Sequence, residues 1–404
     1  MSFLHREIAL LCALLSSVLS LPLSFASDPK AATPVKRQAT SGLDASASAE
    51  TSFYLDDTHV GVVTPTIAGT ISSPTAGWSL SGRYLVDVVT AASPDIVATA
   101  SPPWTEVRHA GNLEGGYEKG DVGVGAHASL SREPDYLSIS AGLRGTLELD
   151  EKNYGVLLGY AYRHDTAGRA GTPFDVFGWT LERHDLNAGL TIVVNPSTIA
   201  AIQLDAMFER GNQAKPYRYV PLFEAGAAEE VPVGASVELV SALRLHARPL
   251  EALPFTRDRF ALTGRLAHRR SGGTLRVEER LYTDSWGMAA STTDARYSID
   301  IGRYVTIWPR LRFHAQTGTV FWQRATEVAV AADGSITIPE IRTGDRELGP
   351  LWTLTGGGGV SVKLGARFTA SLQVDGVFTH YLDALYLTRR NALFSALALQ
   401  ATFD

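Results

Sequence analysis

The 404-residue chain has one cysteine, Cys12, and it lies in an apolar stretch at the N-terminus. If that stretch is removed, the mature chain can form no disulfide, no thiolate metal site and no cysteine nucleophile. Lipid attachment at Cys12 is not expected either, because leucines precede it where such a site needs a small residue. The absence of cysteine suits an oxidising envelope compartment.

Lysine and long apolar runs are also scarce. Arginine outnumbers lysine 30 to 6, and the formal net charge of −6 gives no reason to expect nucleic acid as a partner. After the N-terminal stretch there is no run of about 18 apolar residues, the length that a membrane-spanning helix needs. A mature chain in a membrane would therefore cross it as a closed sheet, which satisfies every backbone polar group in lipid.

The N-terminus is typical of a secretory signal peptide. A short charged start precedes the apolar run Ile8–Leu23, and small residues stand before a cut after Ala26. We predict a signal peptide at 1–26, a flexible periplasmic leader at 27–45 and an outer-membrane barrel at 46–404 in a Gram-negative bacterium. A membrane anchor is the alternative, although its apolar core would be short.

The segment from Phe177 to Arg210 indicates the fold. Apolar and polar side chains alternate along both halves, with Leu186 and Leu190 on the apolar face, and the turn at 195–198 joins the halves into a β-hairpin. The two arms are longer than the about 5 to 6 residues of a typical soluble strand. Their length suits tilted strands that cross a bilayer.

Similar segments repeat along the chain, so we predict an all-β, transmembrane, antiparallel up-and-down barrel. Sixteen strands are favoured and fourteen are the alternative, because bacterial barrels have even numbers. Counted back from a periplasmic C-terminus, alternate connections are short turns and longer loops, as expected for the two sides of an outer membrane. The longest, 211–258, is predicted to be extracellular, and it could also fold into the pore because 236–248 alternates too.

The positions of the tryptophans and a run of glycines predict two further features of the barrel wall. Tryptophans near the ends of predicted strands, including Trp308 and Trp352, are assigned to an aromatic girdle at the membrane interface. The glycine run 356–359 has no lysine and no following helix, so it is not a phosphate loop. We expect it to mark a bend, or a place where a group inside the barrel comes close.

Charged residues at the polar parity of the predicted strands form a ladder along the lumen. Cross-strand ion pairs would stiffen the wall, and the same groups would set selectivity, where the arginine excess favours anionic solutes. Asp87, Ser93 and Asp95 are placed at the outer mouth, either as a strand-to-loop corner or, with Glu106, as an acidic mouth for cations. The ladder comprises Arg83, Asp87, Glu106, Arg108, Arg144, Glu148, Arg163, Arg183, Asp185, Asp205, Glu209, Arg265, Arg276, Glu278, Arg280, Arg310, Arg312, Arg367 and Asp375.

Six short segments carry a resemblance to a known family. They are Phe53–Asp57, Val86–Asp95, Tyr160–Asp165, Asn195–Thr198, Pro216–Arg218 and Tyr282–Gly287. In this order they resemble an uncharacterised bacterial outer-membrane β-barrel family, domain of unknown function thirty-five-seventy. The resemblance implies a barrel with no assigned activity, and neighbouring flavin-transferase and thioredoxin-like genes hint at periplasmic redox or flavin-related partners. The enlarged insertion between Pro216 and Arg259 departs from the family, so a loop-borne function does not carry over.

An enzyme is the alternative to a channel or a structural barrel. Candidates are His164 with Asp165, His184 with Asp185, or a cluster of Asp56, Asp57 and His59. Neighbours on a strand point to opposite faces, which excludes the pair at 184–185, whereas the pair at 164–165 lies at a loop entrance and could form a dyad. The ten histidines show no metal-ligand spacing. We therefore predict no catalytic residues, no metal and no cofactor.

The sequence thus favours a channel or transporter for small polar solutes, with anionic ones suggested by the arginines, or the pore of an envelope redox or export system. A plugged structural or partner-binding barrel is the first alternative, and a surface hydrolase is the second. Expected partners are outer-membrane lipids, the barrel-assembly machinery that reads the terminal strand ending at Phe403, and periplasmic redox or flavin-related proteins.

Overall fold

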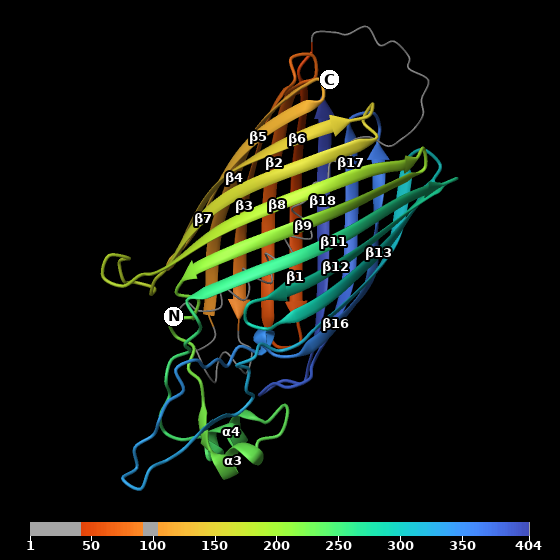
Figure 1. Ribbon diagram of the computed structural model, residues 1–404. Helices are drawn as coiled ribbons and strands as arrows, with labels where there is room; N and C mark the ends of the chain where they lie inside the picture. The colour runs from red at the N-terminus through yellow and green to blue at the C-terminus, as the bar shows by residue number, and fades with distance from the viewer. Residues whose placement is uncertain (1–41, 92–103, 404) are drawn as a thin grey trace.

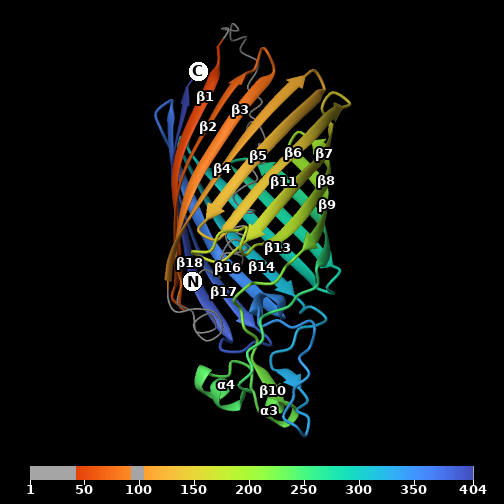
Figure 2. The ribbon, with the colours of Figure 1, turned by 90° about the vertical axis from the view of Figure 1, so that its left-hand side faces the viewer.

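The computed structural model describes residues 42–91 and 104–403, with the side chains of Ala91 and Trp104 excepted. Sixteen strands close into one antiparallel barrel (Figure 1, Figure 2), which confirms the predicted fold class and the favoured strand number. The first and last strands pair to close it, with Ala45 opposite Phe403. The predicted signal peptide and most of the leader lie outside the described residues.

The barrel strands run in sequence order around the wall, each paired with its neighbours. The first nine are β1 Asp44–Asp56, β2 Val60–Ser73, β3 Trp78–Ala91, β4 Trp104–Lys119, β5 Val122–Glu133, β6 Tyr136–Leu149, β7 Tyr154–Ala167, β8 Trp179–Asn195 and β9 Thr198–Gly211. The other seven are β11 Thr256–Arg270, β12 Gly273–Asp284, β13 Ala289–Ile301, β14 Val305–Gln316, β16 Leu351–Leu364, β17 Phe368–Tyr381 and β18 Arg389–Phe403.

The outer wall of the barrel is apolar. In the β8–β9 hairpin, Leu186, Leu190 and Ile202 are 46%, 38% and 54% exposed. Because such side chains would be buried in a water-soluble sheet, their exposure around a closed barrel fits a surface that contacts lipid. Period-two alternation then directs the other residues of each strand into the lumen.

Among the described residues, no helix is long and apolar enough to span a bilayer.

One charged residue departs from the face pattern. Glu279 lies in the middle of β12 at the parity of Leu275 and Leu281, which are exposed on the outer wall. Its carboxylate accepts hydrogen bonds from the hydroxyls of Ser291, at 2.6 Å, and Thr293. These two bonds lower the cost of holding a carboxylate against lipid.

The two ends of the barrel differ. At one end, called here the short-turn end, connections such as 196–197 and 271–272 are brief, and the C-terminus lies there (Figure 1). At the opposite, long-loop end, two long connections between barrel strands build a small extra unit, the loop domain, from residues 212–255 and 317–350. This division into short turns and long loops is the one expected of a bacterial barrel.

The loop domain lies beyond the end of the barrel (Figure 1, Figure 2). Phe223, Val231 and Val240 are fully buried in its own apolar core. The prediction that 236–248 forms an alternating strand is wrong, because Ser236 caps a helix there by accepting a hydrogen bond from the Leu239 backbone N–H at 3.2 Å. The loop domain contains β10 Leu222–Glu224, α3 Ala225–Glu229, α4 Val237–Leu243, β15 Thr326–Val328 and the 3-10 helix η1 Arg346–Leu348.

Buried ion pairs hold the two long loops together. Asp345 of the second loop contacts both Lys215, at 2.8 Å, and Arg218, at 2.7 Å, of the first. Glu251 accepts a hydrogen bond from the hydroxyl of Thr343 at 2.6 Å. Because these groups are buried, each needs its partners, so the two loops form one unit rather than two independent ones.

Candidate functional site: the lumen and its outer mouth

Charged side chains of the lumen face form ion pairs within a strand, between neighbouring strands and across an intervening strand. Residues of one face in adjacent strands lie side by side, and the long arginine side chain also reaches a carboxylate two strands away. Arg108 contacts Asp87, and Glu148 pairs with Lys152 in the next turn. The others are Arg144–Glu114 at 2.6 Å, Arg183–Asp185 at 2.8 Å, Arg259–Glu209 at 2.7 Å, Arg265–Glu278 at 2.5 Å, Arg280–Asp205 at 3.0 Å and Arg310–Asp375 at 2.9 Å.

Four arginines of the predicted ladder take part in none of these ion pairs. Arg163 lies opposite Arg183 in the β7–β8 register, and Arg83 has Glu50 as a charged neighbour. Arg312 lies opposite Asp294 on β13. The assignment of Arg367 to the lumen is wrong, because it lies exposed in the turn before β17 rather than on a strand.

The candidate dyad of His164 and Asp165 is also not formed. Strand β7 continues to Ala167, so the two residues are neighbours on a strand rather than at a loop entrance. Asp165 is buried on the lumen side and His164 faces the opposite way. His184 is on the outer wall, where its ring bonds the Tyr160 hydroxyl at 2.9 Å.

At the predicted acidic mouth, the Asp87 carboxylate is already hydrogen-bonded to neighbouring side chains. It is 2% exposed and accepts hydrogen bonds from the Thr64 hydroxyl at 2.5 Å and from Arg108 Nε at 2.6 Å. A carboxylate held in this way stabilises the wall rather than presenting a free charge. Ser93 and Asp95 lie outside the described residues.

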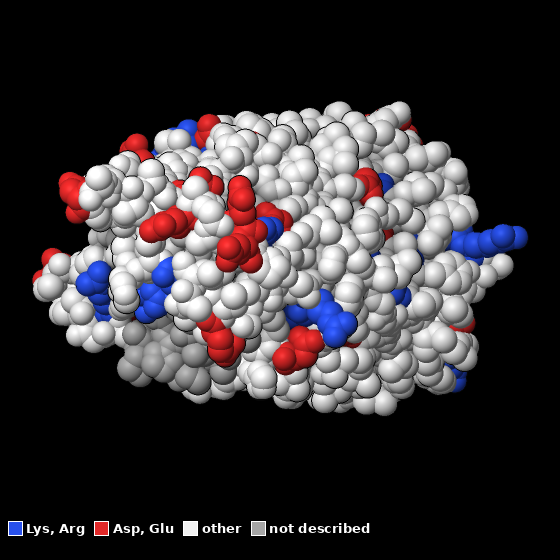
Figure 3. All heavy atoms as spheres, turned by 90° about the horizontal axis from the view of Figure 1, so that it is seen from below, with Lys and Arg blue, Asp and Glu red and all other residues white. Residues whose placement is uncertain are grey.

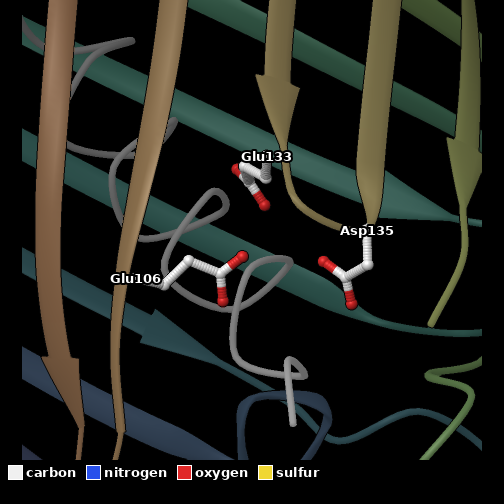
Figure 4. Close-up of side chains that lie close together, drawn as sticks. All are labelled: Glu106, Glu133 and Asp135. Atoms are coloured by element: carbon white, nitrogen blue, oxygen red, sulfur yellow. The ribbon is translucent and has the colours of Figure 1, made fainter. Parts of the chain in front are cut away.

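Glu106 joins a different group of carboxylates. Its oxygens converge with those of Glu133 and Asp135 (Figure 4), and the three carboxylates approach within 4.8 Å of one another. We call these three buried residues the acidic cluster. Burial, and after it the negative charge of Asp135, raises the pKa of the Tyr217 phenol, which the loop domain brings to this place. Oxygen ligands so arranged suit a hard divalent cation or a basic group.

The acidic cluster was only partly visible in the sequence. Glu133 ends β5 and pairs with Tyr136 at the start of β6, so the tight turn between them carries Asp135 toward the lumen. The two acids flank Pro134, and this acid–proline–acid turn is the signal that could have found them.

Arginines gather on strands β12 to β14, which we call the arginine wall. Arg276, Arg296 and Arg310 are in register across these three strands. Arg296 and its neighbour Asp294 were missed in the sequence, although the alternation of β13 places both at the lumen parity. The acidic cluster lies at the opposite side, because β5 and β13 are seven positions apart on a ring of sixteen strands (Figure 2).

The glycine run on β16 admits two large groups from inside the barrel. A Cβ at Gly357 would lie 2.2 Å from Asp375 Oδ1, because that carboxylate crosses the glycine to reach Arg310. A Cβ at Gly359 would lie 2.5 Å from the ring of Trp308. The assignment of Trp308 to an aromatic girdle is therefore wrong, because its ring packs over the lumen face of β16.

Comparisons with known proteins place the chain in a family. The model of a family described as "Protein of unknown function (DUF3570)" matches residues 180–390, just over half of the chain, which confirms the predicted family. Of the six short segments, Asn195–Thr198, Pro216–Arg218 and Tyr282–Gly287 lie within the matched residues. No curated protein is similar in sequence.

Solved structures with a similar fold are outer-membrane barrels. The siderophore receptor PirA of Pseudomonas aeruginosa shares 13% identity and a TM-score of 0.42 over 84% of this chain and 56% of the receptor. A bacterial polysaccharide outer membrane secretin shares 9% identity and a TM-score of 0.45 over 90% and 99%. OccAB1 of Acinetobacter baumannii shares 10% identity and a TM-score of 0.39 over 90% and 97%. The chain spans about half the length of the receptor.

Proposed function

We propose a function for this chain, which belongs to the family described as "Protein of unknown function (DUF3570)": it is an outer-membrane channel for small polar solutes. The solvent exposure of charged side chains in the lumen supports this proposal. Arg144 and Glu114 are 51% and 31% exposed although they form an ion pair, and Arg280 is 40% exposed. A lumen filled by packed side chains would bury these groups, whereas a wet lumen lets them stay charged.

In this proposal the long-loop end faces the outside and the short-turn end faces the periplasm. Figure 3 looks onto the long-loop end, where Figure 1 shows the loop domain, and acidic and basic side chains are scattered over this surface. Solutes would enter beneath the loop domain, pass the acidic cluster and meet the arginine wall further in. Arginines facing a wet lumen favour anionic over cationic solutes.

Planar bilayers test the channel directly. The purified full-length protein should produce discrete steps of conductance in potassium chloride, while protein unfolded by boiling in detergent should produce none. If folded protein, verified by its shifted mobility on unheated gels, gives no steps, then the channel proposal fails.

A partner-binding barrel is the second candidate function. The loop domain supports it, since a separate core around Phe223 gives this end a firm surface that a wall of short loops would lack. The narrower role as the pore of an envelope redox or export system would be tested by cross-linking in the native envelope. Recovery of a periplasmic redox or flavin-linked protein with the barrel would support it, and recovery of assembly proteins alone would count against it.

A further inference from the structure

The carboxylates near the arginine wall are already occupied. Arg310 is only 7% exposed and pairs with both Asp294, at 2.5 Å, and Asp375, at 2.9 Å. Glu278 pairs with Arg265 on β11. Asp294, Asp375 and Glu278 are therefore paired with Arg310 and Arg265, and form no ion pair with Arg276 or Arg296.

Two of those neighbours lie side by side. Arg276 and Arg296 are directly opposite each other in the β12–β13 register, and within the described chain neither forms an ion pair. The charged groups that act on Arg296 are Arg310 and Arg276, which repel it, and Asp294 and Asp375, which attract it but are both paired with Arg310. Arg276 is exposed to the lumen and Arg296 is half-buried. Repulsion between two adjacent guanidinium groups is relieved when an anion binds between them.

An aromatic donor lies next to Arg296. The guanidinium of Arg296 is 5.5 Å from the centre of the Trp308 ring. The ring nitrogen Nε1 of Trp308 is buried and has no hydrogen-bond partner among the described residues. A buried N–H without a partner is costly, and an indole N–H can only donate. Its free donor therefore points to an acceptor that is not part of the described chain.

From these observations we propose that Arg276, Arg296 and the Trp308 indole N–H form a binding site for an anionic solute. The solute class is small molecules that carry a carboxylate or phosphate group, because the planar guanidinium fork matches both groups with two parallel hydrogen bonds. This inference rests on the proposed channel and adds to it a defined site and a substrate class. Packing of Trp308 against Gly359 holds the indole in place beside Arg296.

Inorganic phosphate is the probe for the test. Chloride current through the full-length channel in a bilayer should fall as phosphate is added, because phosphate occupies the site. In Arg296→Gln the half-blocking concentration should rise about tenfold, the loss expected for a charge-assisted hydrogen bond. Trp308→Phe keeps the ring and removes the N–H, so it should raise this concentration by less. Arg276→Gln is a second charge variant, in case Arg296→Gln does not assemble.

Arg303→Gln is the matched control, because Arg303 is exposed in the turn between β13 and β14 and stacks on Tyr304 away from the site. Its half-blocking concentration should equal that of the unchanged protein. Equal block in all variants, or a lumen that prefers cations, would overturn the anion site.

A complete lack of conductance would instead overturn the channel. The anion site would then be tested by calorimetric titration of phosphate into the detergent-solubilised protein, where Arg296→Gln must bind about tenfold more weakly than Arg303→Gln. Equal binding by the two variants, or none by the unchanged protein, would overturn the site on its own.

Discussion

The wall made by β3–β6 and the wall made by β12–β14 face each other across the lumen and carry opposite charge. The first presents Asp87, Glu106, Glu114, Glu118, Glu133, Asp135 and Glu148 against three arginines, Arg83, Arg108 and Arg144. The second presents Arg276, Arg280, Arg296, Arg310 and Arg312 against Glu278, Asp284, Asp294 and Asp300. The first wall thus has a clear excess of acids and the second a small excess of arginines, so the electrostatic potential differs between the two sides of the lumen.

The two walls also differ in how their charges are used. On the first wall, Asp87 and Arg108 are paired with each other, and the three carboxylates of the acidic cluster lie at the long-loop end near Tyr217. On the second wall, Arg310 takes two carboxylates, and so leaves Arg276 and Arg296 without one. Ion pairs therefore stiffen the first wall. On the second wall two arginines remain without an ion pair, and these two are the residues that we propose to bind an anion.

The largest expected effect tests whether the walls face the lumen at all. Leu190→Arg should prevent assembly, because it places a charge on the lipid side at a cost of ~2 to 4 kcal/mol. Asn187→Arg, on the lumen side of the same strand, should be tolerated. Heat-dependent mobility of outer-membrane fractions on gels distinguishes folded from unfolded barrels. If the two variants assemble equally well, the assignment of faces is wrong for both walls.

The next effect separates a paired arginine from an unpaired one. Arg108→Gln leaves Asp87, which is 2% exposed, without its cation, and should lower the free energy of unfolding by about 3 kcal/mol. Arg276→Gln breaks no ion pair and should change it by less than about 0.5 kcal/mol. Urea titration of the protein in lipid vesicles measures both. Equal losses would mean that the walls do not differ in pairing.

A smaller loss is expected at the glycine run. The added methyl of Gly357→Ala would meet the Asp375 carboxylate and the Val374 carbonyl oxygen, so the Asp375–Arg310 pair must shift at a cost of about 1 to 3 kcal/mol. Gly356→Ala is the control, because nothing lies within 4 Å of its Cβ position. The same urea titration applies. A stable Gly357→Ala protein would show that the pair across the glycine is not needed.

The smallest effect concerns the acidic cluster. The double variant Glu133→Gln and Asp135→Asn removes two negative charges from the path of anions, and should raise the preference for chloride over potassium roughly twofold. Reversal potentials under a salt gradient measure this preference. The effect should shrink in 1 M salt, where charges are screened beyond ~3 Å. A change that persists at high salt would point to altered pore shape instead.

Strand number and faces could be predicted from the sequence because their signals are local. The alternation around Leu186 and Leu190 repeats along the chain, and a lipid-facing residue needs no knowledge of its distant neighbours. The same local reasoning was wrong for Arg367 and for the pair His164–Asp165, because it depends on where each strand begins and ends. Boundaries are set by pairing with the next strand, which the local pattern does not contain.

The amino-acid sequence by itself thus determined an antiparallel barrel with an apolar outer face and a charged inner face, and it favoured sixteen strands over fourteen. Only the tertiary structure decided which charges meet. Closure of the sheet sets β5 across from β13, register aligns Arg276 with Arg296, and the turn after Glu133 completes the acidic cluster. The physical reason is that alternation has a period of two residues, whereas contacts across a lumen depend on the number of strands and the stagger of the whole closed sheet.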